Sequence, residues 1–193
     1  MPNTQIVAVS KSKDALRASL QRVPTTKIVF ISSPSTVKDV IELRNFFSIE
    51  LKIPTEIRTL GTKTEEACRM FKEFENPILH LIDHDYVNYM LVNAAVISGV
   101  PVYFSNGRGA ERISTPEIKF KELISDVQVE ILEELQEGPL SLLELAERID
   151  CDESMLYYYL HGKNSLKGLV NLGLVKDGDQ IELSETGRAV VSS

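Results

Sequence analysis

The sequence predicts a chain in two parts: an α/β domain built on a mostly parallel sheet, and a smaller domain of helices with a β-hairpin. Short β-branched runs alternate with amphipathic stretches up to residue 104, as they do in successive βα units. A segment rich in Gly and Ser, SNGRGAERISTPE, then interrupts the pattern. The charge changes as well, from +2 over residues 1–125 to −9 over residues 126–193. We therefore predict domains at residues 1–109 and 126–193, joined at residues 110–125 by a linker and the start of a connecting helix.

The strands of the first domain are predicted from apolar runs, because strands buried in a parallel sheet have nearly continuous apolar sequences. Five such runs occupy residues 6–9, 27–31, 55–59, 78–82 and 100–104. Helices are predicted between them at residues 13–22, 35–51, 64–74 and 86–98. Prolines lie at or just before strand starts, where a missing N–H costs least: Pro24, Pro54, Pro77 and Pro101. This order predicts a Rossmann-like sheet covered by helices.

The second domain is predicted to begin with two helices. The helical pattern of residues 118–137 ends at Gly138-Pro139, which is a normal stop signal. Ser141 is a good N-cap for a second helix over residues 142–149. Glu144 lies where it completes a capping box.

A third helix is predicted from Ser154, either continuous to Leu172 or broken near His161-Gly162. A hairpin across Asp177-Gly178-Asp179 follows, and Ser184 caps a final helix. The order of helix, helix, helix, two-stranded wing and helix is that of a winged helix-turn-helix.

Composition excludes several classes of protein. The chain has 193 residues, of which 43% are hydrophobic and 25% charged, as in an ordinary globular protein. No stretch approaches the ~18 apolar residues of a membrane helix, and the N-terminus is too polar for a signal peptide, so we expect a cytoplasmic protein with no membrane partner. Cys68 and Cys151 are far apart, without a CxxC motif or clustered His. We therefore expect no disulfide, no metal site and no cofactor.

The loops that follow the predicted strands contain many hydroxyl groups, and Lys11, Lys63 and Arg108 add positive charge. Ligands of open parallel sheets bind beyond the C-terminal ends of the strands. Hydroxyls and free helix N–H groups bind phosphate, and a guanidinium can hold it bidentately. These features favour a nucleotide or oligonucleotide ligand, although such residues also gather at any strand-to-helix turn because they cap helices. The predicted ligand-binding residues are Ser10, Lys11, Ser12, Ser32, Ser33, Ser35, Thr36, His84, Asp85, Tyr86, Asn88, Asn106 and Arg108.

Two histidines have contrasting interpretations. His84 lies between Asp83 and Asp85, and a carboxylate beside an imidazole can make it a general acid or base. The alternative is a polar loop that caps the following helix. His80, within a predicted strand, is expected to be a core residue with its hydrogen bonds satisfied.

The third helix of the second domain and its surroundings carry a polar and aromatic surface. The predicted DNA-binding residues are Ser154, Tyr157, Tyr158, His161, Lys163, Asn164, Lys167 and Lys176. The net charge of −9 opposes DNA binding, because Lys and Arg supply most of the affinity for phosphates. The alternative is a winged helix that serves for dimerisation or protein docking.

Both parts resemble known families. SLLELAERIDCDESMLYYYL and LKGLVNLGLVKDGDQIELSETGRAVV are similar to the winged helix-turn-helix of bacterial and archaeal transcription regulators, with residues 161–165 as extra material inside the recognition helix. IVAVSKSKDALRASLQRV, KIVFISSPST and ILHLIDHDYVNYMLVNAAVISGVPVYFSNG resemble, in order, the CRISPR-associated Rossmann fold (CARF) domain.

The resemblance implies a homodimeric, DNA-binding transcription regulator that binds a nucleotide second messenger, a cyclic oligoadenylate, across its two-fold axis. One alternative is a metal-independent ring nuclease that cleaves the cyclic oligonucleotide with Ser10, Lys11 and His84. Another is an adaptor whose acidic winged helix docks a basic protein.

Overall fold

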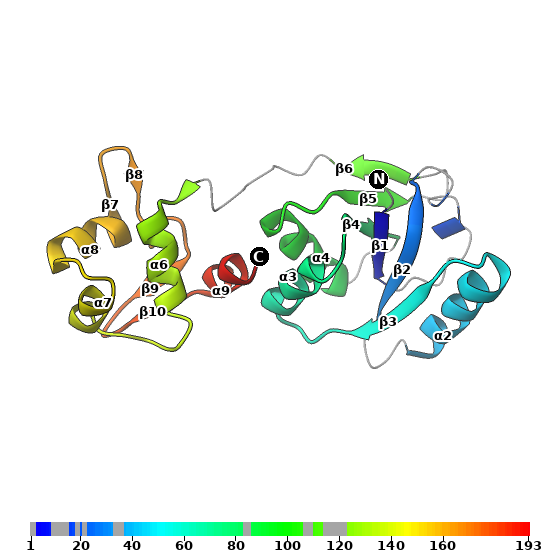
Figure 1. Ribbon diagram of the computed structural model, residues 1–193, viewed down its shortest axis with the longest axis horizontal. Helices are drawn as coiled ribbons and strands as arrows, with labels where there is room; N and C mark the ends of the chain where they lie inside the picture. The colour runs from blue at the N-terminus through cyan, green and yellow to red at the C-terminus, as the bar shows by residue number, and fades with distance from the viewer. Residues whose placement is uncertain are drawn as a thin grey trace. The chain divides into compact units, whose positions relative to one another are not determined.

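A computed structural model describes residues 3–8, 16–17, 20, 23–32, 37–82, 86–105, 110–113 and 123–193, with residues 37–39 and 86–87 described by their backbone (Figure 1). The chain divides into two compact units, Met1–Ile118 and Lys119–Ser193. Within the described residues, no helix combines the length and the apolar character needed to cross a bilayer.

The first unit is mixed α/β, with a mostly parallel six-stranded sheet in the order β3-β2-β1-β4-β5-β6. Each predicted apolar run overlaps one of the five parallel strands. The strands are β1 (Asn3–Ala8), β2 (Thr25–Ser32), β3 (Thr55–Thr59), β4 (Pro77–Leu81), β5 (Val102–Ser105) and β6 (Ala110–Ile113).

The strand β6 corrects the sequence prediction, which placed a loop and the start of a linker there. It runs antiparallel to β5, with Ala110 opposite Ser105 and Ile113 opposite Val102. Three of its four residues are exposed, so the strand has no apolar run by which to recognise it. An edge strand is held by backbone hydrogen bonds along one side only. Backbone hydrogen bonds do not require particular side chains, so the sequence does not indicate them.

Helices cover the sheet on both sides (Figure 1). On one face, α2 (Val37–Asn45) and a π-helical turn, η1 (Phe46–Glu50), pack against the buried side chains of Val7, Ile28 and Phe30. Figure 1 shows α3 (Thr64–Lys72) and α4 (Tyr86–Ile97) on the other side of the sheet, where they pack against each other.

The second unit begins with three helices, α6 (Asp126–Glu134), α7 (Leu142–Arg148) and α8 (Glu153–His161). The capping box predicted for α7 is confirmed, since Ser141 Oγ accepts from Glu144 N and the Glu144 carboxylate accepts from Ser141 N. The predicted third helix is present as α8 but begins one residue earlier than predicted, at Glu153, because its cap is Asp152, which accepts from Met155 N at 2.9 Å.

The continuous version of the third helix is also wrong. The helix α8 ends at His161, and a short hairpin of β7 (Gly162–Lys163) and β8 (Leu166–Lys167) follows. Gly162 and Asn164 both have positive φ, of 85° and 57°, which a helix does not accommodate. A Cβ on Gly168 would overlap the backbone of His161, so the two ends of the hairpin meet only because this residue is Gly.

The remainder of the unit is β9 (Val175–Asp177), β10 (Ile181–Leu183) and α9 (Glu185–Ser192). The predicted hairpin is confirmed, with β9 and β10 antiparallel. Ser184 caps α9 as predicted, accepting from Gly187 N at 2.9 Å. The core of the unit is aliphatic and lies between these elements: Ile131, Leu132, Leu135, Leu145, Leu156, Leu160, Leu169 and Leu174.

Candidate functional site

The first candidate site is the edge of the sheet at which the five parallel strands end. The register aligns Ala8 with Ile31, Ser32 with Thr59, and Leu81 with Phe104. The segments that follow these strands therefore all leave from the same edge. The strand order reverses direction between β1 and β4, which makes this position the topological switch point of the sheet.

The described residues include only part of the predicted ligand set. Ser32 ends β2, is buried, and its Oγ lies 3.3 Å from Thr59 Oγ1, so this hydroxyl joins the ends of two strands. Tyr86 begins α4, and Asn88 is buried in the first turn of that helix. The other predicted ligand residues lie outside the described residues: Ser10, Lys11, Ser12, Ser33, Ser35, Thr36, His84, Asp85, Asn106 and Arg108. They include the three residues proposed for catalysis, Ser10, Lys11 and His84.

The loop after β3 carries a feature that the sequence analysis did not identify. Gly61 N donates to the Glu66 carboxylate at 2.8 Å, and a Cβ on Gly61 would lie 2.6 Å from the same oxygen. A carboxylate repels phosphate, and Lys63, beside it, is exposed. Glu66 therefore places a carboxylate at the loop that follows β3, an edge strand of the sheet.

His80 contradicts the expectation of a satisfied core residue. It lies on β4 between Val7 on β1 and Tyr103 on β5, and its side chain is fully buried. Neither Nδ1 nor Nε2 has a hydrogen-bond partner among the described residues. Burial disfavours the charged imidazolium and lowers the pKa of His80 to about 4, so the ring is neutral at pH 7. The described residues contain no cluster of His, Cys, Asp and Glu that could hold a metal ion with it.

A pocket of about 690 Å³ lies at the opposite edge, where the parallel strands begin. Its lining includes Asn3, Asn76, Ser98 and Tyr103 together with three prolines, and none of the described residues that line it is charged. A pocket without cations is poorly suited to phosphate. This pocket lies at the opposite end of the strands from the loops predicted to bind a nucleotide.

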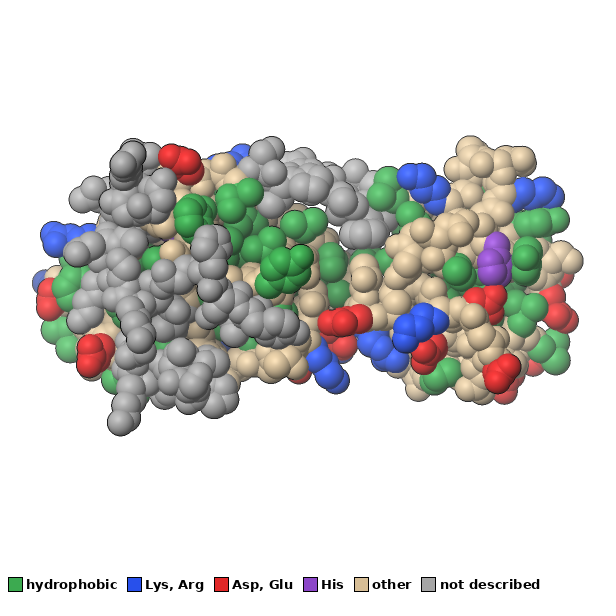
Figure 2. Space-filling model, turned by 180° about the vertical axis from the view of Figure 1, so that it is seen from behind, with side chains coloured by type: hydrophobic (Ala, Val, Ile, Leu, Met, Phe, Trp, Pro, Cys, Tyr) green, Lys and Arg blue, Asp and Glu red, His purple; other side chains and the backbone are tan. Residues whose placement is uncertain are grey.

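The second candidate site is the surface around the end of α8. The structure brings together four of the residues predicted to bind DNA. The rings of Tyr157 and His161 are 4.2 Å apart, and Lys163 Nζ lies 3.9 Å from the centre of the Tyr158 ring. His161 Nε2 also lies 2.9 Å from Asp177 Oδ2 on β9. Figure 2 shows Lys and Arg side chains on this unit interspersed with hydrophobic and acidic side chains.

The other predicted DNA-binding residues are more scattered. Ser154 is exposed near the start of α8, whereas Asn164 and Lys167 are exposed on the β7–β8 hairpin. Lys176 on β9 is paired with Glu182, at 3.1 Å between Nζ and Oε1. An aromatic and cationic surface is thus centred on the end of α8 and on the hairpin.

Sequence reasoning missed Gln128, which positions that surface. It is fully buried on α6, and its Nε2 donates to Tyr159 O at 3.0 Å and to Lys167 O at 2.7 Å. Its Oε1 accepts from Ser125 N at 3.0 Å, which completes a second capping box. The spacing of Ser125 and Gln128 indicates that box in the sequence, but the two long-range bonds depend on the tertiary fold.

No family model and no curated protein matches the sequence. Among solved structures, the chain is similar to Can2 from Sulfobacillus thermosulfidooxidans in complex with cyclic tetra-adenylate, at a TM-score of 0.43 and 12% identity over 98% of this chain and 63% of that one. It is also similar to protein VC1899 from Vibrio cholerae, at a TM-score of 0.44 and 11% identity over 97% of this chain and 64% of that one. The chain spans less than two thirds of the length of either structure.

Proposed function

We propose that the protein is a cytoplasmic, homodimeric transcription regulator that responds to a nucleotide second messenger. In this proposal the first unit is a CARF-like sensor, and the second is a winged helix-turn-helix that binds DNA. The observation that carries the proposal is the position of the switch point between β1 and β4. Open α/β sheets bind their ligands at this position.

The segments next to the switch point have the chemistry that phosphates require. Ser10, Lys11 and Ser12 follow β1, and His84 follows β4. Arg108 follows β5, the next strand along the sheet. In sequence order, hydroxyl groups and Lys11 follow β1, His84 follows β4 between Asp83 and Asp85, and Arg108 follows β5. Lys11 and Arg108 favour an anionic ligand.

A cyclic oligoadenylate is the ligand that the resemblance to CARF domains implies. Such a ligand is a ring of adenosine units joined by phosphodiesters, so it can lie on the two-fold axis of a homodimer and contact the same loops in both copies. A ligand that binds one arrangement of the two copies better than another shifts the population toward that arrangement. The two winged helices would then change their spacing on DNA.

The output role of the second unit is supported by its order of elements. The capped α7 is followed after a short turn by α8, and β9 and β10 form a hairpin after it. This order of elements supports the proposal of a helix-turn-helix with a wing, in which α8 would be the recognition helix.

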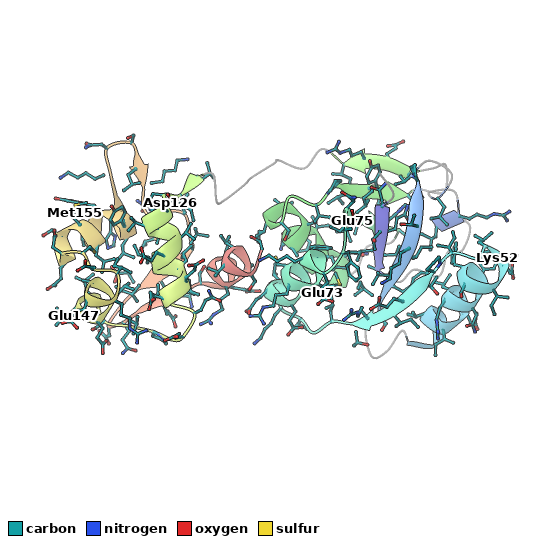
Figure 3. All side chains as sticks on the ribbon, viewed as in Figure 1. Lys52, Glu73, Glu75, Asp126, Glu147 and Met155 are labelled. Carbon is teal, nitrogen blue, oxygen red and sulfur yellow. The ribbon has the colours of Figure 1, made fainter. Side chains whose placement is uncertain are left out.

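A protein-docking role for the same unit is the second candidate. Its observation is the combination of a −9 charge with three exposed apolar side chains, Leu143 on α7 and Met155 and Tyr157 on α8. Figure 3 shows Met155 on α8. Exposed apolar groups among acidic residues suit a basic protein partner.

The sensor proposal is tested by thermal unfolding of the full chain with cyclic tetra-adenylate, cyclic di-adenylate and AMP. A ligand at 100 times its Kd adds about 2.7 kcal/mol to stability, so one cyclic oligoadenylate should raise the Tm and AMP should not. Lys11→Gln and Arg108→Gln should each reduce the shift. Lys72→Gln is the matched control, because Lys72 ends α3 and lies outside the loops that follow the strands. A Tm unchanged by every cyclic oligoadenylate would overturn the proposed sensor.

A further inference from the structure

Some Lys and Arg side chains of the second unit form ion pairs with carboxylates, and others do not. Arg148 is held by two carboxylates, at 3.2 Å from Glu134 and 3.1 Å from Glu137, and Lys176 is paired with Glu182. Of the remaining cations among residues 123–193, Lys163 and Lys167 lie on the β7–β8 hairpin and Arg188 lies on α9. Within this part of the chain, none of these three has a carboxylate at ion-pair distance. Two of the three free positive charges are therefore on one hairpin of six residues.

The start of α8, by contrast, is negative. Asp150, Asp152 and Glu153 are exposed there, and Asp152 caps the helix. Carboxylates at a helix N-terminus stabilise the helix. They also repel DNA phosphates, and the N-terminal residues of a recognition helix are those that usually enter the major groove. This end of α8 is therefore poorly suited to the DNA backbone.

The hairpin is held in place at its base. Gln128 on α6 donates to Lys167 O, Leu169 N donates to Tyr159 O at 3.0 Å, and Asn171 Nδ2 donates to His161 O at 2.6 Å. At its tip, Asn164 with a positive φ makes a two-residue turn. A structure fixed in this way loses little conformational entropy when it binds.

The pairing also determines where the two lysines point. Lys163 pairs with Leu166, and Gly162 pairs with Lys167. Paired residues of an antiparallel ladder project from the same face, and successive residues from opposite faces, so Lys163 and Lys167 project from opposite faces of the hairpin. On one face, the Tyr158 ring supports the Lys163 ammonium.

We infer that the β7–β8 hairpin, and not the start of α8, carries the phosphate contacts between the second unit and duplex DNA. The major groove, about 12 Å wide, admits a two-stranded β-ribbon. A ribbon with one cation on each face meets the phosphates of both strands from within the groove. Tyr157 on α8, 53% exposed and with its ring 4.2 Å from that of His161, offers an aromatic contact for the bases. The inference rests on the proposed DNA-binding function and names the element that performs it.

The test is the salt dependence of binding by the full chain to a fluorescent 30-bp duplex of mixed sequence, measured by anisotropy. Each phosphate contact contributes about −0.9 to the slope of log K against log salt concentration. In the double variant K163Q/K167Q the slope should therefore become less steep by about 1.8. K163R/K167R should keep the wild-type slope, because the charges remain.

Two control variants test whether the change in slope requires loss of the hairpin lysines or follows from any change of charge in the unit. Lys176→Gln removes a lysine that is already paired with Glu182, so the slope should stay unchanged. Glu153→Gln removes a negative charge from the start of α8 and should not weaken binding. Thermal unfolding of each variant confirms that the fold is retained.

The outcomes separate the hairpin from the function as a whole. Wild-type binding with an equal slope in K163Q/K167Q would overturn the hairpin inference and leave DNA binding in place. No binding by the wild type at 20 mM salt would overturn both. Retention on a basic protein such as a histone, with no DNA binding, would then favour the docking role.

Discussion

Gln128 Nε2 donates a hydrogen bond of 2.7 Å to the backbone carbonyl of Lys167, across 39 positions of sequence. The same amide nitrogen donates to Tyr159 O at 3.0 Å. A single buried side chain on α6 therefore holds both the last turn of α8 and the second strand of the hairpin. The position of the cationic hairpin depends on this amide.

Replacing Gln128 with Ala removes the donor to two backbone carbonyl oxygens and half of a capping box. We expect the free energy of unfolding to fall by about 1–3 kcal/mol, which is the cost of leaving a buried polar group unsatisfied. Urea unfolding followed by circular dichroism measures the change. Gln136→Ala is the matched control at an exposed position and should change stability by no more than about 0.5 kcal/mol. Equal stability of the two variants would contradict the role given to Gln128.

His80 should make stability depend on pH. The pKa of His80 is about 4 in the folded chain, below the value of about 6.5 for an exposed histidine. The unfolded chain therefore binds a proton first as the pH falls. The free energy of unfolding is therefore highest above pH 6.5. Protonation of His80 lowers it by about 3 kcal/mol in total as the pH falls from 6.5 through 4.

The variant His80→Leu isolates this effect, because leucine has a similar volume and no nitrogen to leave unpaired. Its stability at pH 7 should equal or exceed that of the wild type. Urea unfolding between pH 4 and pH 7 should show a smaller loss in the variant than in the wild type. The same pH dependence in both proteins would show that His80 does not titrate as described.

Two glycines of the second unit should respond differently to alanine. A Cβ on Gly168 would overlap the backbone of His161 and Gly162, whereas a Cβ on Gly178 meets no atom closer than Gln180 O at 3.8 Å. Gly168→Ala should destabilise the unit by more than about 2 kcal/mol, because backbone rather than a flexible side chain must move. Gly178→Ala should change stability by less than about 1 kcal/mol. Comparable melting temperatures for the two variants would mean that the hairpin base is not closed as the structure shows.

The sequence predicted the parallel strands because a strand covered on both faces has to be apolar throughout, as Phe30 and its neighbours are. It did not predict β6, whose residues Glu111, Arg112 and Ile113 are exposed and pair with β5. The hairpin after His161 was only partly indicated. Gly162 suggested a break, but the pairing of Lys163 with Leu166 depends on local turn geometry.

The candidate sites, like the fold, were only partly predictable from the sequence. The loops of the ligand site follow from where strands end, so Ser10, Lys11 and His84 were assigned to one edge from the sequence. The lack of hydrogen bonds to the His80 imidazole cannot be predicted from the sequence. Hydrogen bonding by the imidazole nitrogens of His80 depends on the neighbouring strands. There, β1 and β5 place Val7 and Tyr103 in register with it, and neither nitrogen has a hydrogen-bond partner among the described residues. The bonds of Gln128 to Tyr159 and Lys167 are likewise tertiary.

The most direct test of the account is the affinity of the full chain for a duplex DNA with and without a saturating cyclic oligoadenylate. If the two sites are coupled, the ligand should change the affinity for DNA by about 5–150-fold, and DNA should change the affinity for the ligand by the same factor. Anisotropy gives the first number and calorimetry the second. An affinity for DNA that is identical with and without bound ligand would contradict the proposal of a ligand-responsive regulator.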